Sequence, residues 1–167
     1  FGTGSAEMAV AYVEYCHYDR GTKWSELRRS HGFEKPHNVR YWCLGNEMDG
    51  PWQIGQMQSR EYGRKARDAA QQMRVVDPTL QLIACGSSGT GMPQYLVWDR
   101  EVLEECYDMV DGLSLHAYYG NTQPLTGNKA SDLVNNRTKR IFNDRTGLAA
   151  SQSTAPFLIQ RYLREQM

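Results

Sequence analysis

Three short apolar runs separated by helical patterns constrain the fold of this 167-residue chain more than any other feature. The runs at residues 39–45, 80–85 and 110–118 are rich in strand-forming residues, and each stops at glycine or at polar and aromatic residues. Helical periodicity fills the intervals, over about 59–76 and 95–107. Strands that alternate with helices at this spacing form right-handed βαβ units, so the sequence predicts an α/β fold with a parallel sheet.

A further helix is expected before the first strand. Ser5 can cap a helix over about residues 6–18, and Glu7 lies in its first turn, where a carboxylate is favourable. Residues 21–37 then form a polar connection, with a helical turn expected near 25–29. The first strand would therefore follow a helix and a long polar segment.

The character of the sequence changes after about residue 121. Residues 122–167 hold seven Lys and Arg but only three Asp and Glu, a net charge of +4. Their first half shows no clear strand pattern, and one short element is expected over 156–163. We therefore divide the chain into a folded region, residues 1–121, and a divergent tail, residues 122–167.

The charge balance argues against two classes of partner. Nineteen Lys and Arg offset nineteen Asp and Glu, so the chain has no overall field that would attract nucleic acid or an anionic membrane. No apolar run approaches the roughly 18 residues of a membrane span. Ten tyrosines and four tryptophans supply ample aromatic surface of the kind on which sugars stack.

The cysteines indicate a reducing compartment. None lies in a CxxC pair, and each falls within an apolar helix or strand pattern, which favours buried free thiols over disulfides or metal ligands. We therefore expect a cytoplasmic protein, although the chain begins at Phe1 and the lack of a signal peptide adds nothing to this expectation. The four cysteines are Cys16, Cys43, Cys85 and Cys106.

The first strand ends in the most chemically suggestive residues of the chain. Asn46 and Glu47 follow it directly, a turn at residues 49–51 takes the chain out of the sheet, and Trp52 comes next. In parallel α/β folds the carboxyl ends of strands carry catalytic groups. Glu47 could donate a proton to a leaving-group oxygen, while Asn46 binds a sugar hydroxyl. The alternative is a solvated strand-to-loop junction without chemistry.

The third strand also ends in polar residues. His116 and Tyr118 are two residues apart and therefore share one face of the strand, from which both could reach the same cavity. Packing is the alternative role for this pair. The glycine- and serine-rich segment 86–91 lacks the lysine of a phosphate-binding loop and is expected to be a flexible loop at the rim. The remaining histidines show no metal-ligand spacing, so no metal is expected.

Together these stretches resemble the α-L-arabinofuranosidases of glycoside hydrolase family 51. Residues 41–53, YWCLGNEMDGPWQ, are similar to the acid/base motif of that family. The supporting stretches occur in the order found in the family and cover residues 1–121 nearly continuously. They are GTGSAE at 2–7, VEYC at 13–16, GTKW at 21–24 and LSLHAYYGN at 113–121.

The resemblance implies part of a (β/α)8 TIM barrel, from the end of strand three to strand six. It implies that Glu47 is the general acid/base of a retaining hydrolase, that Asn46 binds the sugar, and that Tyr118 and His116 line the arabinose subsite. Trp52 would lie close to that subsite. The implied substrates are arabinose-containing oligo- or polysaccharides of plant walls, and no cofactor is implied. The resemblance leaves open whether the parent enzyme is a homo-oligomer.

The resemblance also implies a second carboxylate that the sequence does not supply. The family's nucleophile is a glutamate at the end of strand seven, whereas the acids of residues 122–167 are Asp132, Asp144 and Glu165, none of them after a plausible buried strand. We therefore expect an incomplete, inactive fragment. Two alternatives stay open: another barrel glycosidase with Asn-Glu at strand four, and a carbohydrate-binding fragment without turnover.

Overall fold

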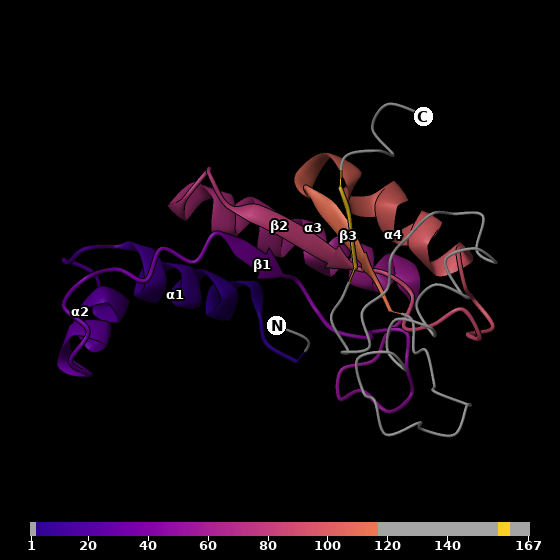
Figure 1. The fold of residues 1–167 in the computed structure, drawn as a ribbon, viewed down its shortest axis with the longest axis horizontal. Helices are drawn as coiled ribbons and strands as arrows, with labels where there is room; N and C mark the ends of the chain where they lie inside the picture. Colours follow the sequence, from indigo (N-terminus) through magenta and orange to yellow (C-terminus); the bar gives the residue numbers. More distant parts are fainter. Residues whose placement is uncertain (1–2, 117–156, 161–167) are drawn as a thin grey trace, which may run out of the picture.

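A four-stranded sheet forms the centre of the computed structural model, which describes residues 3–116 and the backbone of residues 157–160 (Figure 1). The strands are β1 (Tyr41–Cys43), β2 (Gln81–Cys85), β3 (Gly112–Leu115) and β4 (Phe157–Gln160), and they lie in the order β1-β2-β3-β4. The first three strands are parallel, whereas β4 pairs antiparallel with β3. The predicted parallel pairing of the three apolar runs is confirmed.

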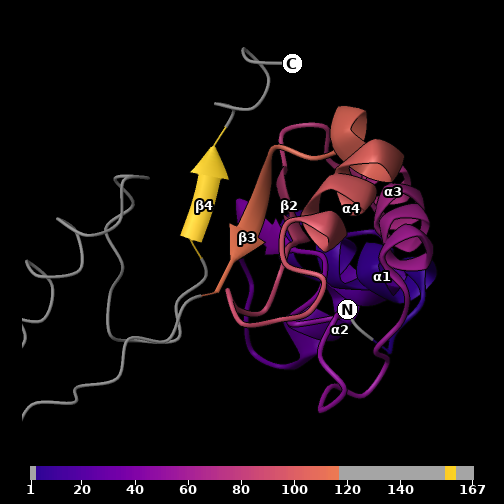
Figure 2. The same cartoon turned by 90° about the vertical axis from the view of Figure 1, so that its right-hand side faces the viewer.

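Two crossover helices connect the parallel strands. The helices are α1 (Ala6–His17), α2 (Lys23–Ser30), α3 (Ser59–Val76) and α4 (Val97–Cys106), and a 3-10 turn, η1 (Tyr107–Met109), follows α4. The helix α3 joins β1 to β2, and α4 joins β2 to β3. Figure 2 shows α3 and α4 on the same face of the sheet, with β4 at its edge beside β3. The chain thus forms two successive βαβ units.

Local sequence signals explain where the helices begin and end. Ser5 caps α1 by accepting a hydrogen bond from the Met8 amide at 3.3 Å. Thr22 and Ser25 form a reciprocal capping box at the start of α2. The helix α3 ends at Val76, just before Asp77-Pro78, because proline cannot continue the hydrogen-bonded ladder.

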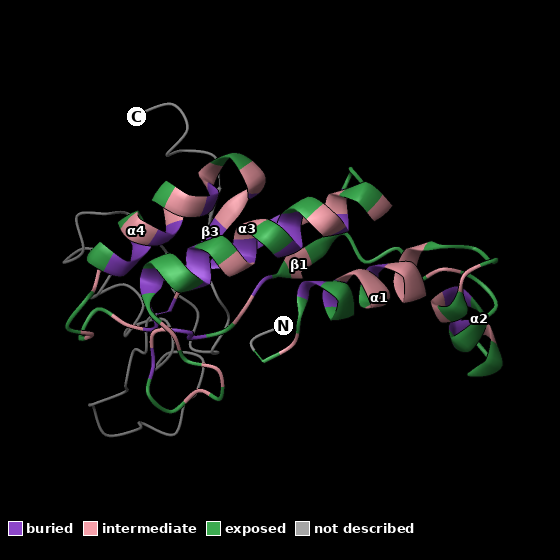
Figure 3. Ribbon diagram, turned by 180° about the vertical axis from the view of Figure 1, so that it is seen from behind, coloured by how far each residue is buried: buried purple, intermediate pink, exposed green. Residues whose placement is uncertain are grey.

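The core lies between the sheet and the helix layer. Leu82 and Ala84 of β2 and Leu113 of β3 face the helices and are almost fully buried. The rings of Tyr62 in α3 and Trp98 in α4 stack there, with their centroids 5.8 Å apart. Full burial of a large apolar side chain contributes roughly 1.5–3 kcal/mol. Figure 3 shows buried and exposed residues alternating along α3, as in an amphipathic helix packed on a core.

A buried arginine holds the segment around α2. Arg28 is fully buried, and its guanidinium donates only to backbone carbonyl oxygens on both sides of the helix. Five carbonyls accept these bonds, and they join the end of α1 to the connection that leads to β1. The acceptors are Tyr15, Tyr18, Asp19, Phe33 and Glu34.

Several details differ from the expectations. The thiols of Cys85 and Cys106 are buried, but Cys43 is exposed and Cys16 is only partly buried. Cys43 is exposed because β1 is an edge strand of the described sheet and its neighbours Trp42 and Leu44 are the residues that face the helices. The helical spacing of Tyr12 with Ala9, Val13 and Cys16 predicts a place on the buried face of α1, but Tyr12 is 63% exposed.

Two further expectations concern the ends of the chain. A short element was expected over 156–163, and β4 (Phe157–Gln160) lies within that range. The proposed boundary near residue 121 falls outside the described residues and stays a prediction. None of the helices in the described part of the chain combines the length and the apolar character that a membrane crossing requires.

Candidate active site

Loops that follow three neighbouring strands meet at one edge of the sheet. Residues 46–52 follow β1, residues 86–88 follow β2, and His116 follows β3. Because these strands are parallel, their carboxyl ends lie at the same edge. Main-chain hydrogen bonds join the loops, from the Gly86 amide to the Ser114 carbonyl at 2.8 Å and from the His116 amide to the Ser87 carbonyl at 3.2 Å.

The backbone turns sharply where Glu47 leaves the sheet. Glu47 has φ +49°, in the left-handed region that non-glycine residues rarely adopt. Its carbonyl accepts a hydrogen bond from the Gly50 amide at 2.9 Å, which closes a tight turn. At Gly45 (φ +154°), a Cβ would lie 2.8 Å from Cγ of Met48, so the strand end has no room for a side chain. This turn directs the Glu47 side chain back toward the sheet edge.

The Glu47 carboxylate lies between two aromatic partners. Glu47 is only 8% exposed. The indole N–H of Trp52 donates to Oε2 at 2.6 Å, and Nδ1 of His116 lies 2.8 Å from Oε1. Both oxygens are therefore hydrogen-bonded, which fixes the orientation of the carboxyl group. A buried, oriented carboxyl group that shares a hydrogen bond with an imidazole can exchange a proton with a bound substrate.

The structure brings together three of the five predicted site residues. Glu47, Trp52 and His116 are in direct contact, although they lie up to 69 positions apart in the sequence. Asn46 is exposed beside them, at the end of β1. Tyr118 lies outside the described residues. The catalytic and binding roles of all five stay predictions.

A second set of polar residues at the same edge was not predicted to be functional. Asp49 accepts two hydrogen bonds from Ser88, from its amide at 3.0 Å and its hydroxyl at 3.2 Å. Asp99 accepts likewise from Ser87, at 2.7 and 2.5 Å. The expected flexible rim loop is therefore wrong for its first residues, because Ser87 and Ser88 are buried and anchored. Their position directly after a buried strand was the available signal, the same one that located Glu47.

The Cys85 thiol lies near this edge but does not suit proton transfer. Burial raises the pKa of the Cys85 thiol to about 12. That thiol accepts a long contact from the Met48 amide, at 3.5 Å, and thus helps to seat the turn. Within residues 3–116, no cluster of three or more His, Cys, Asp or Glu side chains could hold a metal ion.

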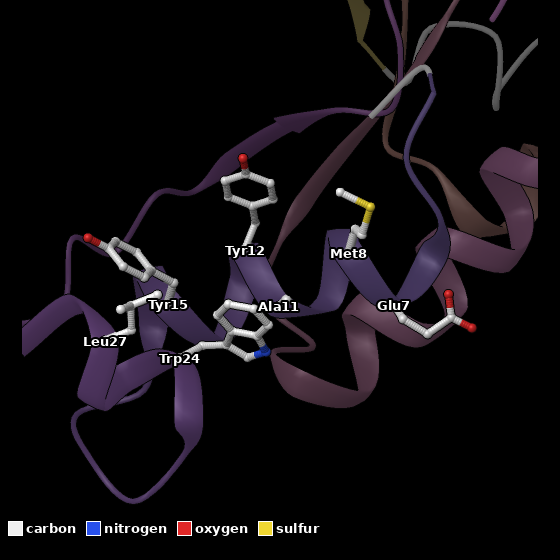
Figure 4. A pocket seen from close by; sticks show the side chains of 7 residues that line it. All are labelled: Glu7, Met8, Ala11, Tyr12, Tyr15, Trp24 and Leu27. Atoms are coloured by element: carbon white, nitrogen blue, oxygen red, sulfur yellow. The ribbon is translucent and has the colours of Figure 1, made fainter.

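A separate cavity lies on the helices α1 and α2, which supply none of these groups. Its volume is about 520 Å³, and its walls are mostly apolar (Figure 4). Its one carboxylate is Glu7, and a hydrogen bond from Ser5 lowers the pKa of that group, which makes it a poor proton donor. The lining residues are Glu7, Met8, Ala11, Tyr12, Tyr15, Trp24 and Leu27.

Comparison with known proteins connects this site with one enzyme family. The family model described as the α-L-arabinofuranosidase 1 domain matches residues 3–137. The chain is 54% identical over 120 residues to the intracellular exo-α-(1→5)-L-arabinofuranosidase 1 of Bacillus subtilis, a match that covers 72% of this chain and 24% of that protein. It is 47% identical over 135 residues to the enzyme of the same type from Acetivibrio thermocellus, covering 79% and 27%.

Solved structures agree with these relatives. A family 51 α-L-arabinofuranosidase from Bifidobacterium longum is similar with a TM-score of 0.70 at 40% identity, over 73% of this chain and 24% of that one. The arabinose complex of the enzyme from Thermotoga maritima gives 0.67 at 34% identity, over 86% and 28%. The chain thus spans about a quarter of the length of these proteins. The predicted fold class, an α/β fold that forms part of a TIM barrel, is confirmed.

Proposed function

Because the chain belongs to the α-L-arabinofuranosidase family of glycoside hydrolase family 51, we propose that it carries the acid/base half of a retaining arabinofuranosidase site. In this proposal Glu47 is the general acid/base. The observation that supports it most is the burial of Glu47 at the carboxyl edge of the sheet, with one hydrogen bond on each carboxylate oxygen. An exposed strand-to-loop junction would show neither burial nor paired orientation.

The arrangement suits both proton transfers of a retaining reaction. In the first step, Glu47 gives its proton to the glycosidic oxygen while a second carboxylate attacks the anomeric carbon. In the second step, Glu47 removes a proton from water, which hydrolyses the glycosyl-enzyme. Trp52 and His116 hold the carboxyl group in place through both steps. The second carboxylate belongs in the segment of the barrel that follows β3, and no cofactor is needed.

The relatives point to the substrate class. Several carry names that specify removal of α-(1→5)-linked L-arabinofuranosyl groups from an end, and one specifies α-(1→6) linkages. We infer that this chain's site accepts a terminal arabinofuranosyl group of an arabinose-containing glycan. In this proposal Asn46 binds a sugar hydroxyl and Tyr118 lines the same subsite, as the resemblance to the family implies. The relatives named intracellular also favour an intracellular location, in accord with four free cysteines.

A chimera tests this function with a complete barrel. Residues 3–116 of this chain replace the matching segment of the Bacillus subtilis relative, and hydrolysis of 4-nitrophenyl α-L-arabinofuranoside is measured with and without Glu47→Gln. We expect hydrolysis with retention, and a fall in kcat of about 100-fold or more in the variant. The 4-nitrophenyl leaving group needs little help from an acid, but the second step loses its general base, and general acid/base catalysis contributes roughly 10²–10⁴. Glu61→Gln, at an exposed glutamate in the first turn of α3, is the matched control and should keep full activity.

Three outcomes would contradict the proposal. A folded chimera whose hydrolysis rate is unchanged by Glu47→Gln removes Glu47 from the mechanism. A preference for 4-nitrophenyl xylosides or β-galactosides points to another barrel glycosidase. Saturable binding of the arabinofuranoside without hydrolysis favours a carbohydrate-binding role instead.

A further inference from the structure

We propose that Asp49 is a positioning residue, which clasps Ser88 and thereby holds the turn that presents Glu47. The clasp consists of the Asp49 carboxylate, Ser88 and Ser87, and it connects back to Glu47 through His116. The role in catalysis rests on the proposed function, whereas the mechanical role is a property of the structure alone. Asp49 itself touches no reacting atom in this account.

The turn at Glu47 needs external support. A left-handed backbone at a glutamate costs free energy that a glycine would not incur, and such residues persist only where their surroundings hold them. The bond from the Gly50 amide to the Glu47 carbonyl closes the turn but does not attach it to the sheet. The long contact from the Met48 amide to the Cys85 thiol is one attachment to the sheet, and Asp49, two residues after Glu47, makes a second, to the neighbouring loop.

The contacts form a closed circuit between three strand ends. Asp49 Oδ2 accepts from the amide and hydroxyl of Ser88. The Ser87 carbonyl accepts from the His116 amide, and the His116 ring reaches the Glu47 carboxylate. The circuit therefore fixes Glu47 from both directions, through its side chain and through its own loop. Loss of the Asp49 arm would remove the hydrogen bonds from Ser88 that tie the Glu47 loop to the loop after β2.

The far side of the clasp is rigid. The amide and hydroxyl of Ser87 donate to the two oxygens of Asp99, at 2.7 and 2.5 Å, in the first turn of α4. At Gly86 a Cβ would lie 2.4 Å from the Ser114 carbonyl oxygen, so the loop packs directly on β3. Ser88 thus offers Asp49 a fixed anchor.

The hydrogen bonds of Asp49 indicate whether its charge or its acceptor oxygen holds Ser88. Its Oδ1 is buried and accepts no hydrogen bond from any residue of the described part, so Ser88 is the partner that the structure gives this carboxylate. An asparagine has the same shape and keeps one oxygen acceptor for Ser88. Asp49→Asn therefore preserves the clasp while it removes the charge, and Asp49→Ala removes both.

Amide hydrogen exchange of the full chain tests the clasp without any need for catalysis. We expect Asp49→Ala to accelerate exchange at Met48 and Gly50 roughly tenfold and to shift the indole N–H resonance of Trp52, because the turn opens more often. Ser88→Ala, which keeps the amide bond, should show about a threefold effect. Asp49→Asn should restore exchange to within about twofold of the unsubstituted chain.

Thr79→Ala is the matched control. Thr79 donates its amide and hydroxyl to Asp77, at 2.8 and 2.7 Å, in the same pattern as Ser88 but beyond the end of α3. The Thr79→Ala substitution should leave the indole N–H resonance of Trp52 and the amide exchange at Met48 and Gly50 unchanged. If Asp49→Ala does not fold, Ser88→Ala and Asp49→Asn decide the question.

Unchanged exchange and an unshifted indole signal in Asp49→Ala, or in Ser88→Ala where only that variant folds, would overturn the proposal. So would an Asp49→Asn variant that exchanges as fast as the alanine variant, because charge and not the clasp would then be responsible. The chimera separates this result from the function. A chimera that fails to hydrolyse contradicts the proposed function, while the exchange data still decide the clasp.

Discussion

The Glu47 carboxylate receives its orientation from a residue that is itself largely in solvent. Trp52 is 57% exposed, yet its indole N–H lies 2.6 Å from Glu47 Oε2. The ring packs against Gly50, where a Cβ would approach it to within 2.4 Å. Glycine at this position therefore lets the ring fold back over the turn. In the proposed function, Trp52 orients the carboxyl group and lies close to the bound sugar.

Replacing Trp52 by phenylalanine should separate orientation from folding. Trp52→Phe keeps an aromatic ring but removes the hydrogen bond to Glu47, and hydrogen bonds to charged groups contribute roughly 1.5–3 kcal/mol. In the active chimera we expect kcat to fall at least tenfold, with a smaller change in KM and little change in thermal stability.

The control for this prediction is Trp42→Phe. Trp42 also donates its indole N–H, to the Val39 carbonyl at 2.7 Å, but it lies within β1 and has no hydrogen bond to Glu47 among the described contacts. Loss of the Trp42–Val39 hydrogen bond in Trp42→Phe should leave kcat unchanged. Equal effects of the two substitutions on kcat would show that Trp52 acts through general stability alone.

At the residue scale, the sequence located groups at strand ends but not the bonds between loops. Glu47 and His116 could be placed because each lies where an apolar run ends. Asp49 was interpreted only as turn punctuation, because its partner Ser88 lies 39 positions away and a turn residue needs no partner. Contacts between loops depend on strand register, which local patterns do not specify.

Among the elements, the helices matched the sequence pattern best. Helix α3 spans Ser59–Val76, as its periodicity and the following Asp-Pro predicted. The strands are shorter than the apolar runs. Leu44, for example, is buried just beyond the last residue of β1, and its amide donates to the Ile83 carbonyl at 2.8 Å. The central role of Arg28 could not be predicted, because an arginine on a short polar helix ordinarily faces solvent.

Replacing Arg28 should release the segment around α2. Arg28→Lys keeps the charge but cannot reproduce the planar set of donors that serves five carbonyls. We expect a loss of about 3 kcal/mol in the free energy of unfolding, because the buried side chain at position 28 loses most of its hydrogen bonds to these carbonyls. Limited proteolysis should then cut first within residues 19–38.

The neighbouring arginine provides the comparison. Arg29 pairs at the surface with Glu34 at 2.7 Å, and exposed pairs contribute about 0–1 kcal/mol. Arg29→Lys should therefore change urea denaturation only slightly. The interpretation of Arg28 would be wrong if both lysine variants unfolded at the same urea concentration as the unsubstituted chain.

At the scale of the whole molecule, the helices cover one face of the sheet. Leu44 and Leu82 face the helix layer, whereas Tyr41 and Cys43 on the alternate positions of β1 are exposed. In a closed barrel that second face becomes the interior. The chain taken alone and the chain within a complete barrel should therefore differ most at this face.

Thiol labelling should report this difference. At pH 8 a maleimide should modify Cys43 first, while Cys85 and Cys106 react last, because burial raises the pKa of each of these two thiols to about 12. In the chimera we expect Cys43 to react at least tenfold more slowly, since the closed barrel covers it. Mass spectrometry of the labelled peptides measures both rates. Similar rates at Cys43 and Cys85 in the native chain, or an unprotected Cys43 in a folded chimera, would contradict this arrangement.

The fold as a whole was predictable only in part. Alternating strand and helix patterns were sufficient for a parallel α/β sheet, and the barrel followed from the resemblance in residues 1–121. The antiparallel strand β4 lay within the expected short element, but its place beside β3 could not be predicted, because pairing between distant segments leaves no local periodicity.

The most direct test of the central claim is how the hydrolysis rate of the Glu47→Gln chimera depends on the leaving group of the substrate and on added azide. If Glu47 is the acid/base, kcat/KM of the variant, which reports the first step, should fall far more on substrates with poor leaving groups than on activated aryl arabinofuranosides, because only the former need a proton in that step. Azide should accelerate the variant on activated substrates by attacking the glycosyl-enzyme in place of water, giving an arabinofuranosyl azide that retains the substrate's anomeric configuration. Equal losses on all substrates, with no azide adduct, would contradict the assignment of Glu47 and the account built on it.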